Sequence, residues 1–315
     1  EVGTIYVQES RFKARRIGAA YVARNIARHL ETALADRGGG FHPLVYCWRG
    51  GMRSNAMATI LSQVGWRTSV LAGGYRTYRR HVTARLYDGT LPHRFVLLDG
   101  QTGSGKTEVL HGLAERGLQA LDLEGLAAHR GSLFGALPGQ PQPSQKLFES
   151  RLLSALDALD PAVLVVAEAE SSKIGDRMIP PALWTRLAEA PRIELVAELP
   201  ERVRYLAAAY ADIAADRAGL EGILARLPTR PSPARLRQWW AWIDAGDLAP
   251  VAEALVNLHY DPAYSRARRK HARTLAGSVA IAPADPPSVG RAVAEVGRLV
   301  LALDGTTAGG DPERR

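Results

Sequence analysis

The sequence predicts an α/β fold in two domains, in which short apolar strands alternate with helices. Three observations carry this prediction. Short apolar runs recur between segments with helical spacing, a glycine-rich loop follows the run Phe95 to Asp99, and a lone cysteine, Cys47, lies between a short strand and a helix. Strands that alternate with helices form a parallel sheet covered on both faces. We therefore expect two α/β domains, of which the second is mostly helical in its C-terminal part.

The first expected domain comprises residues 1–90. Apolar residues recur at helical spacing in its first helix, and glycines end several of its segments. In chain order, the expected elements are a helix at 15–37, a strand at 43–46, a helix at 54–64, a strand at 69–71 and a basic helix at 75–87. The turn-rich break at 88–92 marks the boundary.

The second expected domain comprises residues 91–305. Its expected strands lie at 95–99, 118–123, 162–167 and 193–199, and its first helices run from the glycine loop to about residue 116 and over 145–159. Residues 201–260 have a mostly helical pattern. The tail at 306–315 is polar and contains glycine and proline, so we expect it to be disordered.

Composition and charge indicate what kind of partner the protein has and exclude disulfide-bonded and membrane-spanning classes of protein. The chain has 315 residues and a formal net charge of +8, and residues 1–90 hold 14 basic against 5 acidic side chains. This asymmetry indicates a polyanionic partner, most simply nucleic acid, although a solvated basic face explains it equally well. A single cysteine excludes an internal disulfide, and no apolar run is long enough to span a bilayer. No signal peptide is recognisable, so we expect a cytoplasmic protein that does not enter a membrane.

A phosphate-binding motif follows the strand at 95–99. Residues 100–107, Gly-Gln-Thr-Gly-Ser-Gly-Lys-Thr, match the pattern G-x-x-x-x-G-K-[ST] at every fixed position. The glycines let backbone N–H groups point at phosphate oxygens, and the following helix adds the positive end of its dipole. Lys106 would reach terminal phosphate oxygens, and Thr107 would offer its hydroxyl to Mg²⁺ if a metal is used. The expected phosphate-binding residues are Gly100, Gly103, Ser104, Gly105, Lys106 and Thr107. The domain is thus expected to resemble P-loop NTPases.

Two further pairs of residues lie near strand ends of this domain. Glu168 and Glu170 follow a buried apolar run, where P-loop NTPases place the acid that holds the water shell of a metal ion. Glutamates stand where aspartate is more usual, so the sequence leaves open whether Mg²⁺ is used. The alternative interpretation is that Glu168 and Glu170 are ordinary surface acids after a strand. His129 and Arg130 follow a strand expected beside the P-loop strand and are candidates for substrate contact. The histidines show no metal-ligand spacing, so we expect no metal site.

The loop from Cys47 to Ser54 has the features of a reactive-cysteine site. It reads Cys-Trp-Arg-Gly-Gly-Met-Arg-Ser and lies between a strand and a helix. The thiol is therefore expected at a helix N-terminus among backbone N–H groups, and both features stabilise a thiolate. Arg49 and Arg53 add positive charge that could hold an oxyanion. A thiolate of this kind can accept a sulfur or selenium atom, so we expect Cys47, Arg49 and Arg53 to be catalytic. A buried, inert cysteine is the alternative.

Two sets of motifs together resemble one family. The strand–Cys47–loop–helix unit, followed by Ala-Gly-Gly-Tyr-Arg at 72–76, is similar to the C-terminal half of rhodanese domains. A rhodanese domain directly before a P-loop domain resembles the tRNA 2-selenouridine synthases. The stretches that support this resemblance are residues 24–30, 46–54, 72–76, 100–107, 121–132 and 168–175.

The resemblance implies a specific activity. Members of the family alkylate the sulfur of wobble 2-thiouridine in tRNA with geranyl diphosphate, and then replace the S-geranyl group with selenium from selenophosphate. Carried over, Cys47 would serve the selenium step, and residues 100–107 would hold the diphosphate. The implied partners are the anticodon stem-loop of tRNA and an enzyme that supplies selenophosphate, and no tightly bound cofactor is expected.

One departure and two alternatives remain. A complete rhodanese domain begins with a strand carrying an Asp-Val-Arg-type segment, which this sequence lacks, so we expect an N-terminally truncated or reduced first domain. The first alternative function is a P-loop kinase or NTPase fused to a rhodanese-type sulfurtransferase, with ATP as substrate. The second is a non-catalytic RNA-binding module.

Overall fold

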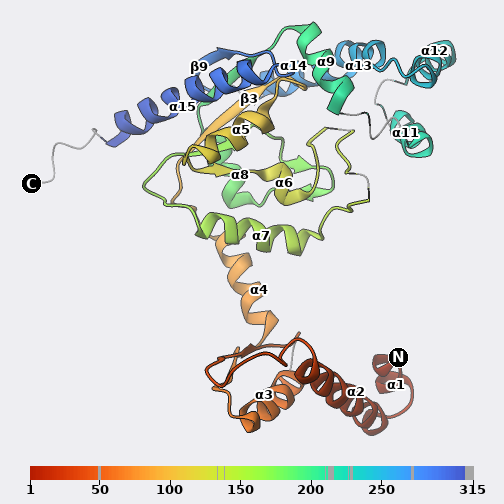
Figure 1. The fold of residues 1–315 in the computed structure, drawn as a ribbon, viewed down its shortest axis with the longest axis vertical. Coiled ribbons are helices and arrows are strands. Elements are labelled where there is room, and N and C mark those ends of the chain that lie inside the picture. Colours follow the sequence, from red (N-terminus) through yellow and green to blue (C-terminus); the bar gives the residue numbers. More distant parts are fainter. Residues whose placement is uncertain are drawn as a thin grey trace, which may run out of the picture. The chain divides into compact units, whose positions relative to one another are not determined.

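The protein divides into two compact units, Glu1–Ala84 and Arg85–Arg315, which Figure 1 shows in sequence colours. The structure, a computed structural model, describes residues 1–48, 51–132, 134–137, 139–209, 211, 216–225, 227, 230–270 and 273–308. The division between the units falls shortly before the turn at residues 88–92. Each unit is described by itself below.

The first unit combines helices with a small parallel sheet. Its strands, β1 (Leu44–Val45) and β2 (Ser69–Val70), pair in parallel. Its helices are α1 (Val2–Gln8), α2 (Arg11–Glu31), α3 (Met52–Val64) and α4 (Tyr75–Thr83). Two short strands are too small a sheet to test the likeness to rhodanese domains, which stays a prediction.

Two helix predictions for this unit need correction. The helix predicted at 15–37 is α2, which begins at Arg11 because Ser10 Oγ accepts a hydrogen bond from Lys13 N over 3.3 Å and caps it. It ends at Glu31, and turns follow. The helix predicted at 75–87 ends at Thr83, where i→i+5 bonding takes over in a π-helical turn, η1 (Ala84–Asp88).

The second unit is built on a five-stranded parallel sheet with the strand order β4-β5-β3-β8-β9. The strands are β3 (Phe95–Gly100), β4 (Ala120–Leu121), β5 (Val165–Glu168), β8 (Arg192–Val196) and β9 (Leu275–Ala280). This confirms the predicted α/β class. The strands predicted at 118–123, 162–167 and 193–199 form only in part, since pairing with a neighbour fixes their ends, and β9 was not predicted. A separate antiparallel hairpin joins β6 (Lys173–Ile174) to β7 (Arg177–Met178).

Helices cover the sheet and continue into a helical C-terminal region. In chain order they are α5 (Lys106–Glu115), α6 (Leu123–Ala127), α7 (Gln145–Asp157), α8 (Pro181–Glu189), α9 (Leu199–Ala209), α11 (Arg217–Leu224), α12 (Pro233–Asp244), α13 (Ala249–Leu255), the π-helical turn η2 (Val256–Tyr260), α14 (Asp261–Lys270) and α15 (Pro286–Ala308). The predicted disordered tail at 306–315 is wrong for its first three residues, because α15 continues to Ala308, and residues 309–315 lie outside the described ranges. No helix in the described part of the chain is long and apolar enough to cross a membrane.

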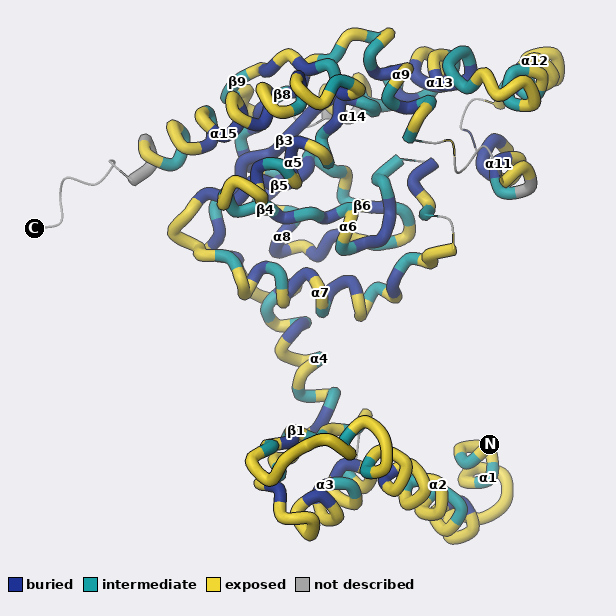
Figure 2. The backbone as a smooth tube through the Cα atoms, in the orientation of Figure 1, coloured by how far each residue is buried: buried dark blue, intermediate teal, exposed yellow. Residues whose placement is uncertain are grey.

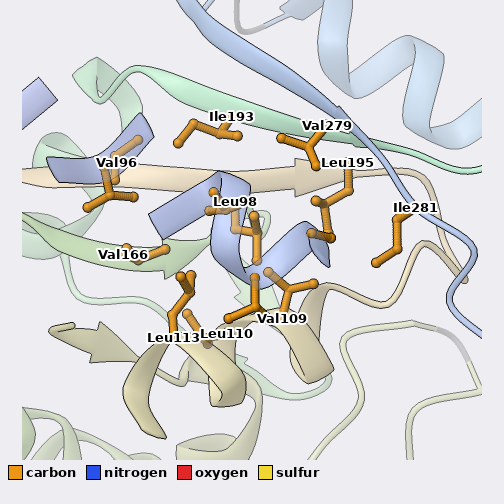
Figure 3. Packing of buried hydrophobic residues seen from close by; sticks show 14 of the residues in the cluster. Val96, Leu98, Val109, Leu110, Leu113, Val166, Ile193, Leu195, Val279 and Ile281 are labelled. Carbon is orange, nitrogen blue, oxygen red and sulfur yellow. The ribbon is translucent and has the colours of Figure 1, made fainter. Parts of the chain in front are cut away.

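The core of the second unit explains why β3 is the central strand. All six residues of β3 are buried, and alternate side chains point to opposite faces. Figure 3 shows Val96 and Leu98 packed with Val109, Leu110 and Leu113 of α5. Helix α15 contributes Val293 and Val296 to the same cluster. Figure 2 shows this buried centre in dark blue between more exposed helices.

Candidate active site

The P-loop is the turn that joins the buried strand β3 to helix α5. Gly103 and Gly105 have φ angles of 84° and 74°, which a residue with a Cβ rarely adopts. Lys106 opens α5, and its Nζ donates a hydrogen bond to Gly100 O over 3.0 Å. Ser104 is only 1% exposed, and its Oγ has no hydrogen-bond partner among the described residues. The loop therefore offers a lysine, a buried hydroxyl and a helix N-terminus to an anion.

Three glutamates lie close behind the P-loop. Glu168 ends β5, is fully buried, accepts a hydrogen bond from Thr107 Oγ1 over 3.4 Å, and accepts a second from Glu124 N over 3.1 Å. The carboxyl groups of Glu124 and Glu170 both approach Gly131, where a Cβ would come within 2.0 Å of Glu124 Oε1 and 3.1 Å of Glu170 Oε1. Gly131 thus leaves room for the carboxyl cluster of Glu124, Glu168 and Glu170.

The carboxyl cluster binds protons more tightly than exposed glutamates do. Burial, followed by the negative charges of Glu170 and Glu168, raises the pKa of Glu124. Burial, followed by the charges of Glu170 and Asp122, raises the pKa of Glu168. The positive charge of Lys106 opposes both shifts. Desolvation and mutual repulsion outweigh the effect of Lys106, so the pKa values of Glu124 and Glu168 lie above the usual range of a glutamate.

A pocket of about 680 Å³ opens over the P-loop and the carboxyl cluster. It is lined by all six predicted phosphate-binding residues and by Glu170, His129 and Arg130. Glu168 is buried beneath it. His129 and Arg130 follow β4, but β4 is not beside the P-loop strand as predicted, since β5 pairs with both β4 and β3. The two residues directly follow Ala128, whose φ of 50° ends α6 and redirects the chain.

Several lining residues were missed by the sequence prediction. Glu124 and Asp122 follow the end of β4, which is a general signal for a ligand edge in a parallel sheet. His111 lies on the first helix, and its Nε2 is 2.9 Å from Asp122 Oδ2. The rest of the lining comes from helices distant in the sequence, and its residues are Tyr205, Leu206, Ala209, His259, Tyr260, Ala263 and Tyr264.

The described residues contain no group of three or more His, Cys, Asp or Glu side chains arranged to hold a metal ion. The carboxyl cluster is therefore not counted among such groups. Glu168 accepts hydrogen bonds from Thr107 and from the backbone N–H of Glu124, and the side chains of Glu124 and Glu170 are hydrogen-bonded to each other.

Cys47 lies after β1, in the turn that leads to α3. Gly51 caps α3 with φ 73°, and Tyr75 N donates to Cys47 O over 3.0 Å. Gly74 approaches so closely that a Cβ there would lie 2.4 Å from Cys47 O. Trp48 stacks on Tyr75 with ring centroids 4.5 Å apart. The segment around residues 72–76 therefore braces the cysteine turn.

The surroundings of Cys47 favour its thiolate. Burial alone would raise the pKa of the thiol. A hydrogen bond from Ser54 Oγ, the backbone N–H groups of Ser54 and Gly51, and the charge of Arg53 lower it by more, so the net pKa is lowered. The distance from Ser54 Oγ to Cys47 Sγ is 3.4 Å. Of the predicted partners, Arg53 lies where expected, whereas Arg49 lies outside the described residues.

A second pocket, of about 240 Å³, adjoins Cys47. Arg53 and Ser54 line one side, and Asn25 and His29 of α2 line another. The sequence prediction did not include Asn25 and His29 among the site residues. Their spacing of four residues on a predicted helix puts them on one face, and both lie in the stretch 24–30 that supports the family resemblance.

The two sites define a class of protein, a P-loop α/β enzyme that carries a thiolate-stabilising cysteine turn in a separate unit. A family model described as "tRNA 2-selenouridine synthase AAA domain" matches residues 93–221. A tRNA 2-selenouridine synthase from Cupriavidus pinatubonensis is 32% identical over 308 residues, covering 86% of this chain and 81% of that protein. One from Bordetella petrii is 31% identical over 331 residues, covering 93% and 86%. One from Aeromonas salmonicida is 36% identical over 209 residues, covering 65% and 54%. The chain belongs to the tRNA 2-selenouridine synthase family.

Proposed function

We propose that this chain converts 2-thiouridine at the wobble position of tRNA into 2-selenouridine through an S-geranyl intermediate. Geranyl diphosphate and selenophosphate are the two co-substrates. Membership in the family supports the overall conversion. The observation that carries the two-step route is that one chain holds a lysine-bearing phosphate pocket and, in another unit, a cysteine with a lowered pKa.

The first step belongs to the P-loop pocket. The sulfur of 2-thiouridine forms a bond to C1 of the geranyl group, the C1–O bond breaks, and diphosphate leaves with the electron pair. The N3 proton of the base is released in the same conversion. Lys106, the P-loop N–H groups and the helix dipole of α5 stabilise the charge that develops on the leaving diphosphate. Hydrolysis of a phosphate bond is not required.

The second step belongs to the Cys47 turn. The Cys47 thiolate forms a bond to C2 of the base, the bond between C2 and the geranyl-bearing sulfur breaks, and geranylthiol leaves with a proton. The selenium of selenophosphate then forms a bond to C2, and the bond from C2 to Cys47 Sγ breaks, which restores the thiolate. Water then cleaves the Se–P bond, phosphate is released, and N3 regains a proton. The positive loop around Cys47, with Arg53 and the N–H groups of Gly51 and Ser54, suits an anionic selenium donor. An enzyme that makes selenophosphate is the implied supplier.

The basic first unit suits the tRNA backbone. The sequence of residues 1–84 holds 13 basic against 4 acidic side chains, whereas residues 85–315 hold 27 against 28. Neutralising phosphates releases condensed counterions, which is the main source of affinity for a nucleic acid. We propose that the anticodon stem-loop is bound with help from this charge.

Nucleoside mass spectrometry separates the two steps. The full chain is incubated with tRNA that contains 2-thiouridine, or with the same tRNA already geranylated, and with the two co-substrates. Lys106→Ala is expected to abolish geranylation and still selenate pre-geranylated tRNA. Cys47→Ala is expected to geranylate and to lose selenation. Lys173→Ala, which removes an exposed lysine outside the pocket, is the matched control and retains both steps.

The competing function is a P-loop kinase or NTPase, which the contact between Thr107 and Glu168 also suits. ATP hydrolysis that depends on Lys106, together with no geranylation by the folded protein, would favour this function. Loss of both tRNA products in Cys47→Ala alone would contradict the assignment of the steps to separate sites.

A further inference from the structure

The P-loop pocket has an apolar side that a diphosphate alone does not use. The phosphate-binding residues lie on one side of the cavity of about 680 Å³. The lining also includes carbon-rich residues from α9, η2 and α14, which adjoin the P-loop. We name this set the prenyl wall, and it comprises Tyr205, Leu206, Ala209, Tyr260, Ala263 and Tyr264.

A buried arginine fixes the prenyl wall against the P-loop. Arg202 is 2% exposed, and its Nε donates to Thr102 O over 2.9 Å. Its two terminal nitrogens donate to Asp261 Oδ2 over 3.1 Å and to Asp261 Oδ1 over 2.6 Å. One guanidinium group thus ties α9 to the phosphate loop and to the first residue of α14. Bidentate pairing fixes orientation as well as distance.

Close packing also joins α9 to the P-loop. A Cβ at Gly103 would lie 2.8 Å from Leu206 Cγ, so the P-loop and α9 touch without any space between them. Behind the pocket, Leu206 and Tyr260 belong to a buried cluster that also contains Trp239 and Val256. The prenyl wall therefore has a packed core of its own and keeps its shape without a ligand.

We propose that the prenyl wall binds the isoprenoid chain of an allylic diphosphate whose phosphates lie in the P-loop, and that Ala209 limits the chain length. This inference rests on the proposed function and adds the location of the apolar half of the substrate. An amphiphile with a dianionic head and a hydrocarbon tail needs a charged cradle continuous with an apolar surface, and the pocket supplies both.

The tyrosines suit the reaction as well as the chain. Breaking the C1–O bond of an allylic diphosphate leaves positive charge on the allylic carbons. Aromatic ring faces attract such charge without acting as nucleophiles. Tyr205 is held in place by a hydrogen bond from its hydroxyl to Glu108 Oε1. Burial, followed by the charges of Asp99 and Glu194, raises the pKa of Tyr264, so its phenol stays neutral.

Ala209 lies on α9 beyond the residue that touches the phosphate loop. Leu206 packs on Gly103, and Ala209 follows it by three residues, which adds roughly 4.5 Å along a helix axis. Both residues line the pocket. The small side chain at position 209 leaves space for a second isoprene unit, and a large side chain there would fill that space.

Calorimetric binding of four probes to the full-length chain tests the proposal. The probes are inorganic diphosphate, dimethylallyl diphosphate, geranyl diphosphate and farnesyl diphosphate. Ala209→Phe is expected to weaken geranyl diphosphate by about tenfold or more, because several methylene groups lose their buried surface. Inorganic diphosphate and dimethylallyl diphosphate are expected to bind within about twofold of the parent protein. Ala263→Phe, on α14, is the second variant and tests the same wall from another element.

The control is Ala241→Phe, which adds the same ring at an exposed position of α12 outside the pocket. It is expected to bind all four probes like the parent. Geranyl diphosphate binding unchanged in both Ala209→Phe and Ala263→Phe would overturn the proposal, as would an equal loss of inorganic diphosphate. If the parent protein binds inorganic diphosphate but none of the three prenyl diphosphates, the proposed function and this inference both fail. If the parent protein and both variants bind geranyl diphosphate equally well, the assignment of the prenyl wall is wrong, but the proposed function is not affected.

Discussion

A hydroxyl group seven residues further along the chain favours the thiolate form of Cys47. Ser54 is buried, and its Oγ lies 3.4 Å from Cys47 Sγ. It contributes the largest of the interactions that lower the thiol pKa against the opposing effect of burial. At residue scale, the cysteine turn works as a set of donors arranged around one sulfur atom.

Ser54→Ala is therefore expected to raise the pKa of the Cys47 thiol, because one hydrogen bond to the thiolate is lost. The pH dependence of the iodoacetamide alkylation rate measures this pKa directly, since Cys47 is the only cysteine in the chain. Ser62→Ala, at an exposed position on the same helix, is the control. An unchanged pKa in Ser54→Ala would show that the backbone N–H groups and Arg53 suffice.

The buried carboxyl cluster makes a second prediction, on stability. The pKa is raised from 4.5 to about 8 for Glu168 and to about 10 for Glu124, so the folded protein holds protons that the unfolded chain releases. Their contribution to stability is complete below pH 4.5 and is lost as pH rises through the folded-state values. Glu168→Gln removes one such group. Between pH 4.5 and about 8, the free energy of unfolding of this variant should therefore fall less steeply with pH than that of the parent protein. The two slopes should differ by up to about 1.4 kcal/mol per pH unit.

Urea denaturation at several pH values measures this slope for the parent protein, for Glu168→Gln and for Glu115→Gln. Glu115 is exposed at the end of α5 and serves as the control. Parallel pH profiles for the parent and Glu168→Gln would contradict a protonated Glu168 in the folded state.

At the scale of elements, the contact between the P-loop and α9 explains why position 103 carries glycine. Gly103 and Gly117 both have φ 84°, yet only Gly103 has atoms in the way of a side chain, with Leu206 Cγ 2.8 Å from its Cβ position. Gly117→Ala is expected to cost about 1–2 kcal/mol from backbone strain alone. Gly103→Ala is expected to cost a further 1–3 kcal/mol, roughly, from the clash with α9. Denaturant unfolding of the two variants measures the difference, and equal costs would mean that α9 yields to the P-loop.

The same elements show what local sequence can and cannot predict. The strand β3 and the P-loop were predicted because an apolar run, fixed glycines and a lysine lie next to one another in the chain. The strand β9 was missed, because Leu-Ala-Gly-Ser-Val-Ala has small residues and weak strand propensity, and pairing with β8 creates it. Helix ends moved for a similar reason, since capping by single residues such as Ser10 decides them.

The predictability of the site follows the same division. Glu168 and Lys106 lie at the ends of predicted elements, so their approach to one pocket could be expected from a parallel sheet. Tyr205 and Tyr264 lie about a hundred residues or more beyond the P-loop on helices with no motif. Their place in the pocket depends on the ion pair between Arg202 and Asp261, which no local sequence pattern predicts.

At the scale of the whole molecule, charge is divided between the units. The sequence of the first unit carries 13 basic against 4 acidic side chains, and that of the second is nearly balanced. If the first unit supplies phosphate contacts to tRNA, the salt dependence of binding should depend on its arginines and not on those of the second unit. The affinity itself is expected to fall steeply as salt rises.

The doubly substituted variant Arg76→Gln/Arg80→Gln removes two exposed charges from α4. Each lost phosphate contact is expected to reduce the slope of log K against log salt by about 0.7 to 0.9, so this variant should bind tRNA more weakly and with a shallower slope. The control, Arg291→Gln/Arg298→Gln, removes two exposed charges from α15 whose ion pairs with Asp285 and Glu295 contribute little. Fluorescence anisotropy of labelled tRNA at several salt concentrations gives both slopes. Equal slopes for the two variants would mean that tRNA is held by the whole surface, and the asymmetry of charge would then need another explanation.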